Sequence, residues 1–276
     1  MKQIFSKAGR VVYKNFPSLQ PYVRSAYIRF FAKLNFIGWG MATIHAVPWK
    51  DEHDWADFRE TCRKVKKIFE LTPSAPSSPV NTDDLMWRHW NVSFAVRKAI
   101  KFIETDAYHF VECGVGDGLT SYFTLSEIMH QGLLGHATMH LYDSWQAMEK
   151  ERLIGVEQQH EGNYHSLSLE RTQRNLAEFK DILRYHVGFV PDTFVDAPPE
   201  KIVFLHIDLN SSKPTLAALE FFLPRLVNDG IILLDDYGFF DYAETKKLVD
   251  QFFSDKSGVL QKLPTGQAIY YHRRNN

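Results

Sequence analysis

The sequence contains very few cysteines. Only Cys62 and Cys113 occur among its 276 residues. Two cysteines this far apart provide neither the disulfide framework of a small secreted domain nor the paired thiolates of a zinc knuckle. We therefore expect a reducing, intracellular setting and predict a cytoplasmic protein.

Long hydrophobic runs are also missing. The longest apolar stretch, residues 34–49, falls short of the roughly 20 residues that a membrane-spanning helix needs. Polar residues, glycines and a proline interrupt it at Asn35, Gly38, Gly40, His45 and Pro48. No secretory signal with an uninterrupted apolar segment and a small-residue cleavage site is evident at the start. The sequence predicts a soluble protein.

The chain lacks an excess of charge of either sign. Its net charge is −1 and its pI is about 6.9, which argues against nucleic acid as a partner. The charge is unevenly distributed, however. The first 50 residues contain eight Lys or Arg and no acidic residue, whereas the remainder contains 24 basic and 33 acidic residues. This asymmetry sets the N-terminal segment apart from the rest of the chain.

The basic segment is amphipathic and rich in aromatic residues. Residues 3–15 carry apolar side chains at helical spacing with lysines and an arginine on another face, and a second basic-aromatic stretch follows up to Lys33. We interpret residues 1–35 as an arm that packs on the main domain or on a sister subunit of a homo-oligomer. Peripheral binding to an anionic membrane surface stays open as the second interpretation.

A proline- and serine-rich stretch at residues 72–79 is the clearest linker in the chain. We place the domain boundary there, so that residues 1–80 form a helical N-terminal extension with its linker and residues 81–276 form the main domain. Before the linker, residues 51–71 have a helical pattern. After it, residues 83–104 predict a helix. The inward side chains expected for the first helix are Trp55, Phe58, Cys62, Val65 and Phe69, and for the second Trp87, Trp90, Phe94 and Ile100.

From residue 108 onward, strand and helix patterns alternate. The predicted strands cover 109–113, 137–142, 183–187, 202–207 and 231–234, and a hairpin follows at 259–263 and 267–272. The predicted helices cover 119–131, 166–180, a segment from Ser211 to Asp229-Gly230, and 241–254. This order predicts an α/β fold: a doubly wound, mostly parallel, Rossmann-like sheet with an antiparallel C-terminal hairpin. The polar segment 146–165 is longer than a simple connection within a compact domain, which suggests a lid.

A glycine-rich turn ends the first predicted strand. Glu112 is followed by Gly114, Gly116 and Gly118. Glycines let the backbone approach a ligand closely, and the free amides at the following helix start favour polar or anionic groups. A dinucleotide-binding fingerprint would require its third glycine at the position of Leu119, so the turn does not match that motif.

Acidic residues finish several of the predicted strands. In open α/β sheets, ligands bind beyond the carboxyl ends of the strands, where Asp143, Asp208, Asp235 and Asp236 lie. Asp143 suits a carboxylate that binds ribose hydroxyls. The other three come from adjacent strand ends and would repel one another unless they share a proton or a cation. Oxygen ligands favour Mg²⁺ or Ca²⁺ over zinc.

These motifs together resemble a class I S-adenosylmethionine-dependent methyltransferase. Residues 141–145, 205–208 and 233–237 more narrowly resemble the macrocin O-methyltransferase family, and the resemblance covers roughly residues 83–276. It implies a site for S-adenosylmethionine, with the ribose on Asp143 and the adenine beside the residues after Gly188. The implied cofactor-binding residues are Glu112, Gly114, Gly116, Gly118, Asp143, Ser144, Gly188, Phe189 and Val190.

The resemblance also implies that Asp208, Asp235 and Asp236 hold Mg²⁺. One departure affects this expectation, because Asn210 stands where the family has the second acid of an Asp-Gly-Asp sequence. Asp208 and His206 are the candidate catalytic residues. For a strand histidine such as His206, however, a hydrogen-bonded core position is the more common outcome.

The predicted function is a Mg²⁺-dependent O-methyltransferase acting on a hydroxyl of a small molecule, with a sugar or glycosylated metabolite as the acceptor that the resemblance implies. Two alternatives remain. One is an NAD-dependent oxidoreductase, which Leu119 disfavours. The other is a non-catalytic cofactor-binding module tethered to a membrane-associated biosynthetic complex, which the presence of all three carboxylates disfavours.

Overall fold

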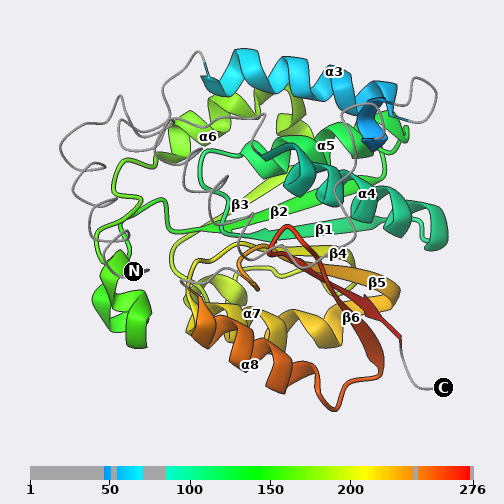
Figure 1. Ribbon diagram of the computed structural model, residues 1–276. Helices are drawn as coiled ribbons and strands as arrows, with labels where there is room; N and C mark the ends of the chain where they lie inside the picture. Colours follow the sequence, from blue (N-terminus) through cyan, green and yellow to red (C-terminus); the bar gives the residue numbers. More distant parts are fainter. Residues whose placement is uncertain (1–46, 51–54, 71–84, 239–241, 274–276) are drawn as a thin grey trace. The chain divides into compact units, whose positions relative to one another are not determined.

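The computed structural model describes residues 47–50, 55–70, 85–238 and 242–273 (Figure 1). The chain divides into two compact units, residues 1–50 and residues 51–276. Only a short 3-10 turn, η2 (Pro48–Lys50), is described in the first unit. The predicted basic arm at 1–35 and the predicted linker at 72–79 lie outside the described residues. Within the described part of the chain, no helix has the length and apolar character needed to cross a membrane.

The second unit is built on one seven-stranded sheet (Figure 1). The strand order is β3-β2-β1-β4-β5-β7-β6, with β1 to β5 parallel and β7 antiparallel to both of its neighbours. This confirms the predicted Rossmann-like sheet with its C-terminal hairpin. The strands are β1 (Tyr108–Cys113), β2 (Ala137–Asp143), β3 (Leu183–Val187), β4 (Ile202–Ile207), β5 (Leu226–Leu234), β6 (Gly258–Lys262) and β7 (Ala268–His272).

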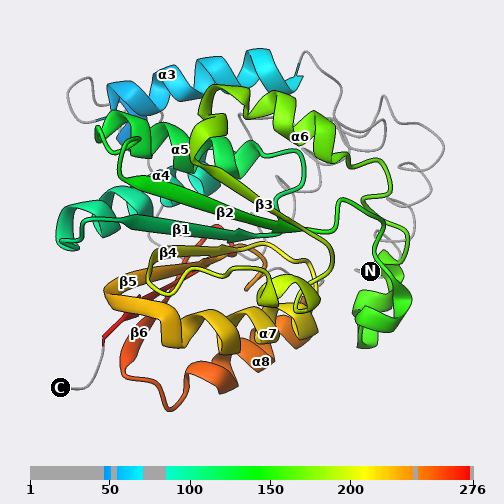
Figure 2. The ribbon, with the colours of Figure 1, turned by 180° about the vertical axis from the view of Figure 1, so that it is seen from behind.

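Helices cover both faces of this sheet (Figures 1 and 2). On one side lie α4 and α5, with α3 stacked over α5; on the other lie α7 and α8. The central strand β4 is buried along its whole length, as expected when both faces are covered. The α-helices among the described residues are α3 (Ala56–Val65), α4 (Met86–Phe102), α5 (Leu119–His130), α6 (Leu169–Asn175), α7 (Ser212–Phe222) and α8 (Ala243–Phe253).

Helix α3 and the π-helical turn η3 (Lys66–Glu70) belong to the unit that contains the sheet. Their predicted apolar stripe is confirmed, since Phe58, Val65 and Phe69 are buried. Phe58 packs on Phe123 of α5 with ring centroids 5.4 Å apart. These contacts lie within the compact unit of residues 51–276, and the domain boundary expected at residue 80 stays a prediction.

The aromatic residues expected inside helix α4 lie mostly on its outer side. Trp87 and Phe94 are each 38% exposed, so the prediction that they are core residues was wrong. The face toward the sheet instead carries small or β-branched side chains. Its buried members include Val92, Ala95, Val96 and Ala99. Small side chains let α4 approach β4 and β5 closely, and helical spacing alone does not distinguish this face from the aromatic one.

Strand β5 starts earlier than predicted. Asp229 and Gly230 were expected to end the preceding helix, but α7 ends at Phe222 and a 3-10 turn, η9 (Leu223–Arg225), with Pro224 near its start leads directly into β5. The register between β4 and β5 shifts after Ile202, and Asp229 adopts a left-handed φ of 62°. Residues 227–230 are thus an irregular insertion within the strand.

The segment after β2 is anchored rather than loose over much of its length. It contains the 3-10 turns η5 (Lys150–Arg152) and η6 (Gly155–His160). Within η6, the carboxylate of Glu157 is fully buried and accepts from the Ser212 amide at 2.9 Å and the Ser211 hydroxyl at 3.2 Å. A carboxylate at the start of α7 satisfies free amides there and complements the helix dipole.

Replacing Glu157 by Gln should destabilise the protein by about 1–3 kcal/mol, because the new NH₂ group would face buried donors instead of accepting from them. Chemical denaturation of the purified protein would measure this. Glu161→Gln is the matched control, since Glu161 is exposed in the same segment, and should cost no more than about 0.5 kcal/mol. Equal stability of the two variants would contradict the anchoring role of Glu157.

Candidate active site

The glycine-rich turn after β1 touches the end of β4. The Gly114 amide donates to the Tyr142 carbonyl at 2.8 Å, and the Asp208 amide donates to the Cys113 carbonyl at 2.8 Å. A Cβ atom at position 114 would lie 1.9 Å from the Asp208 carbonyl oxygen, and Gly114 has a φ of +88°. Only glycine fits here. The turn and the acidic strand ends are therefore immediate neighbours.

Asp143, at the end of β2, holds this turn in shape. Its Oδ2 accepts from the amides of Val115 at 2.7 Å and Gly116 at 2.9 Å, and its Oδ1 accepts from the Trp145 amide at 2.7 Å. Burial raises the pKa of Asp143 above its usual value, while these backbone amides act in the opposite direction. The carboxylate stands at the position where the sequence predicts contact with ribose hydroxyls.

Glu112 and His206 lie deeper in the sheet. Glu112 is fully buried; it accepts from the Ser121 hydroxyl and lies 3.1 Å from His206 Nδ1. His206 is 1% exposed, and its Nε2 is 4.0 Å from Asp235 Oδ1. The imidazole therefore contacts the acid of the glycine motif and faces the acid at the end of β5 without a hydrogen bond to it, and it is enclosed by the protein.

The remaining predicted cofactor-binding residues follow β2 and β3. Gly188 donates its amide to the Asp143 carbonyl at 2.9 Å, so the ends of these two strands meet. Val190 is buried, and the Phe189 ring lies 4.3 Å from the Arg152 guanidinium carbon. Ser144 accepts from the Gln146 amide at 3.2 Å. Gly116 and Gly118 belong to the turn itself, with φ values of +54° and +89°.

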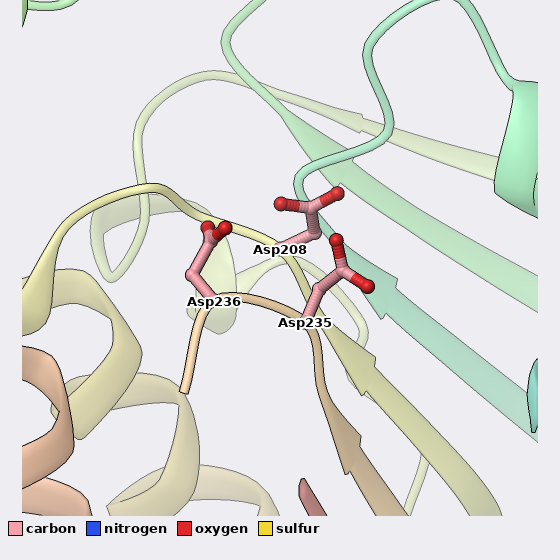
Figure 3. A group of neighbouring side chains, drawn as sticks. All are labelled: Asp208, Asp235 and Asp236. Atoms are coloured by element: carbon pink, nitrogen blue, oxygen red, sulfur yellow. The ribbon is translucent and has the colours of Figure 1, made fainter. Parts of the chain in front are cut away.

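Three carboxylates gather at the ends of β4 and β5 (Figure 3). Asp208, Asp235 and Asp236 each offer an oxygen within 4.8 Å of the others. Burial and the adjacent Asp208 carboxylate raise the pKa of Asp236 well above its usual range. The predicted metal ligands are thus together, and both burial and the Asp208 charge disfavour the ionised form of Asp236.

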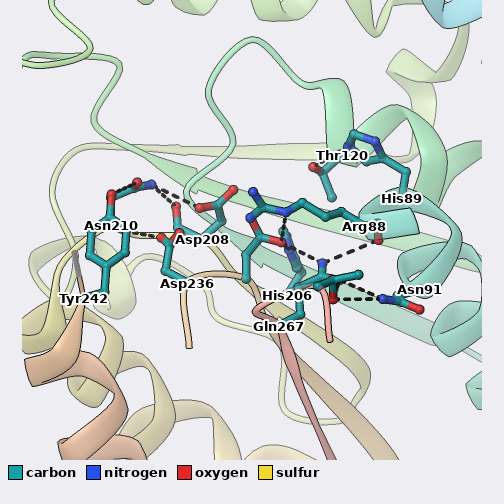
Figure 4. A network of polar contacts seen from close by, with 12 residues as sticks. Arg88, His89, Asn91, Thr120, His206, Asp208, Asn210, Asp236, Tyr242 and Gln267 are labelled. Atoms are coloured by element: carbon teal, nitrogen blue, oxygen red, sulfur yellow. Dashed lines mark hydrogen bonds and ion pairs between the residues drawn. The ribbon is translucent and has the colours of Figure 1, made fainter. Parts of the chain in front are cut away.

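A positive charge from another element reaches the same cluster. Arg88 of α4 forms a two-pronged ion pair with Asp235: its Nε lies 3.2 Å from Oδ1 and a terminal nitrogen contacts Oδ2. Gln267, next to β7, donates to Oδ1 of the same carboxylate at 2.7 Å. Figure 4 shows Arg88 extending from α4 toward the carboxylates.

Asn210 joins the cluster to two tyrosines, of which Figure 4 shows Tyr242. Its Nδ2 donates to Asp208 Oδ1 at 3.1 Å, while its Oδ1 accepts from the hydroxyls of Tyr164 at 2.9 Å and Tyr242 at 2.7 Å. The Asn210 amide also donates to Asp236 at 3.1 Å. An aspartate at position 210 would add a third negative charge beside Asp208 and Asp236. The Asn210 side chain is neutral and donates a hydrogen bond to Asp208.

The donor set fits a hard divalent cation. Carboxylate oxygens are the ligands that Mg²⁺ prefers, and a cation between Asp208 and Asp236 would relieve the repulsion that raises the Asp236 pKa. The residues that would hold it are Asp208, Asp236 and Asp235, the last of which is already paired with Arg88.

Sequence reasoning missed the partners of the cluster. Arg88, Gln267, Tyr164 and Tyr242 are distant from Asp208 and Asp235 in the chain and belong to no motif. Gln267 alone has a sequence signal for its place near the cluster. It directly precedes β7, and β7 starts beside the end of β5 because the two strands pair antiparallel.

Comparisons with known proteins agree with the fold of the second unit. A family model described as a methyltransferase domain matches residues 111–237. The structure of the O-methyltransferase NovP is similar over 79% of this chain and 100% of its own, with a TM-score of 0.66 and 17% identity. The calicheamicin methyltransferase CalS11 is similar over 86% of this chain and 99% of its own, with a TM-score of 0.54 and 15% identity. No curated protein matches the chain significantly.

Proposed function

We propose that this chain, an S-adenosylmethionine-dependent methyltransferase of the class I fold, transfers the methyl group to a hydroxyl oxygen of a sugar or glycosylated small molecule. The oxygen acceptor is supported by the likeness to NovP and CalS11, both described as methyltransferases. Another structure of CalS11 is described as a TDP-rhamnose 3'-O-methyltransferase, with a TM-score of 0.50 and 15% identity. That substrate supports the sugar acceptor, which the family resemblance of the sequence already implies.

One observation carries the proposal: the glycine turn and the acidic cluster are in direct contact at Gly114 and Asp208. A donor bound along the turn would place its reactive methyl group beside the carboxylates that surround an acceptor hydroxyl. Methyl transfer is an in-line displacement, in which the oxygen–carbon bond forms as the sulfur–carbon bond breaks, so proximity supplies much of the rate.

The donor would lie along the ends of β1, β2 and β3. We assign the ribose hydroxyls to Asp143, the methionine portion to the turn from Gly114 to Gly118, and the adenine to the segment from Gly188 to Val190. Glu112 and His206 support the turn from below. Because His206 is enclosed and bound to Glu112, we assign it to positioning rather than to proton transfer.

The acceptor would meet the cluster at Asp208. A Mg²⁺ ion held by Asp208, Asp235 and Asp236 would lower the pKa of an acceptor hydroxyl. Asp208 is the candidate to accept the hydroxyl proton, since it is oriented by Asn210 and borders the glycine turn. Asn210 cannot accept that proton as an acid at this position would.

Asp208→Asn should lower methyl transfer at least about 100-fold while leaving S-adenosylmethionine affinity within about threefold, because the donor contacts lie on other strand ends. The assay would follow label from methyl-labelled donor into sugar nucleotides, TDP-rhamnose among them, with Mg²⁺ or with EDTA. Asp255→Asn, an exposed position on a separate loop, is the control. Transfer that persists in Asp208→Asn, or label found on nitrogen, would refute the assignment.

A further inference from the structure

We propose that Arg88 is a built-in counter-charge of the carboxylate cluster and lowers its affinity for a divalent cation. This inference rests on the proposed function only in taking Asp208, Asp235 and Asp236 as the cation site. Arg88 belongs to α4 and lies outside every motif that defines the strand-end site. It is nevertheless the cationic side chain that binds Asp235 directly.

The ion pair occupies both oxygens of Asp235. Arg88 Nε lies 3.2 Å from Oδ1, and a terminal guanidinium nitrogen contacts Oδ2. The two side chains are largely enclosed, at 22% and 9% exposure. A planar guanidinium matched to a carboxylate in this way is a strong, directional pair, and a lysine cannot reproduce its two-pronged contact. A cation that approaches Asp235 must share or displace this partner.

The pair is braced from two further elements. Gln267 donates to Asp235 Oδ1 at 2.7 Å, and its own side-chain oxygen accepts from Asn91 at 2.9 Å. Asn91 lies on α4, one turn beyond Arg88, and Figure 4 shows this contact linking the helix to Gln267. The arrangement therefore fixes Asp235 from α4 and from the β7 side together, which makes the paired state a defined conformation.

The charges decide the effect on cation binding. Three carboxylates attract a divalent cation, and a guanidinium only one carboxylate away repels it, in a partly enclosed site where screening by solvent is weak. Within the described part of the chain, Asp208 and Asp236 accept hydrogen bonds from Asn210 and form no ion pair with a lysine or arginine. They can hold a cation only loosely, so acceptor oxygens would complete its coordination. The cation and the acceptor are therefore expected to bind together.

Binding of Mn²⁺, followed by electron paramagnetic resonance without any acceptor, tests this directly. Arg88→Gln keeps a hydrogen-bonding side chain and removes the charge. It should bind Mn²⁺ at least about tenfold more tightly than the wild type. Lys101→Gln, an exposed position on the same helix, should leave the affinity unchanged. If Arg88 instead served to orient Asp235 as a ligand, Arg88→Gln would bind Mn²⁺ equally or more weakly, which would overturn the proposal.

The double variant Arg88→Gln with Asp235→Asn guards against misfolding of the single one, since it leaves no unpaired buried charge. If the pair neutralises itself, the double variant should bind Mn²⁺ within about threefold of the wild type. A loss above tenfold would show Asp235 to be a free ligand and overturn the proposal. Absence of Mn²⁺ binding in all variants would do the same. Titration with S-adenosylmethionine separates these outcomes from failure of the proposed function.

Discussion

Asp143→Ala should abolish measurable S-adenosylmethionine binding, lowering the affinity at least about 100-fold. Two losses combine in this variant. The donor ribose loses its proposed carboxylate partner, and the amides of Val115, Gly116 and Trp145 lose their common acceptor. Amides left without a partner at a partly buried turn cost about 1–3 kcal/mol each, so the turn should leave the shape that admits the donor.

Calorimetric titration of the donor into wild type and variant measures this effect. Asp143→Asn distinguishes the two losses, because an amide oxygen can still accept from the turn but carries no charge; we expect a loss of about tenfold. Asp192→Ala is the control, since this residue is exposed and its carboxylate pairs with Arg152. Affinity within threefold of wild type for Asp143→Ala would place the donor elsewhere in the molecule.

Gly114→Ala should prevent folding or destabilise the protein by at least about 3 kcal/mol. The added Cβ would lie 1.9 Å from the Asp208 carbonyl oxygen and 2.6 Å from its carbon, both backbone atoms that cannot rotate away. The left-handed φ of +88° adds about 1–2 kcal/mol of strain for any residue with a Cβ. Relief would require β1 and β4 to separate at their ends.

Gly132→Ala separates strain from collision. Gly132 has a φ of +73° and no atom within 4 Å of an added Cβ. Gly132→Ala should therefore lower the free energy of unfolding only through backbone strain, by about 1 kcal/mol. Denaturant unfolding of both variants, with expression in the folded fraction as a second readout, measures the difference. Similar stability of the two would mean that the turn and β4 are farther apart than described.

Several strands of the sheet were predictable because a glycine or an aspartate marks the end of each apolar run. Gly114, Asp143 and Asp208 each stand at or directly after the end of a buried run, which marks the strand end to within one residue. The positions of these strand ends also predicted that the acidic residues lie at one edge of the sheet. Parallel strands place their carboxyl ends on the same side, so the sequence order of these residues is enough to assemble them.

Other features have no local signal. The buried face of α4 was predicted wrongly because Trp87 and Phe94 are more hydrophobic than Ala95. The short distance between the helix and the sheet leaves room only for small side chains such as Ala95 and Ala99. The early start of β5 depends on pairing with β4. Arg88 could not be linked to Asp235 from the sequence, since the two residues are 147 positions apart and no local pattern shows which helix lies beside which strand end.

The insertion of β7 between β5 and β6 has a consequence for synthesis of the chain. Strand β5 pairs with β4 as soon as both have left the ribosome, but its other edge pairs only with β7. Until residues 268–272 emerge, β5 presents an unpaired row of backbone groups, and Asp235 at its end still lacks Gln267. Nascent chains that stall before this point would expose an unpaired, aggregation-prone strand edge. Chaperone binding to the nascent chain should end once the hairpin has emerged from the ribosome.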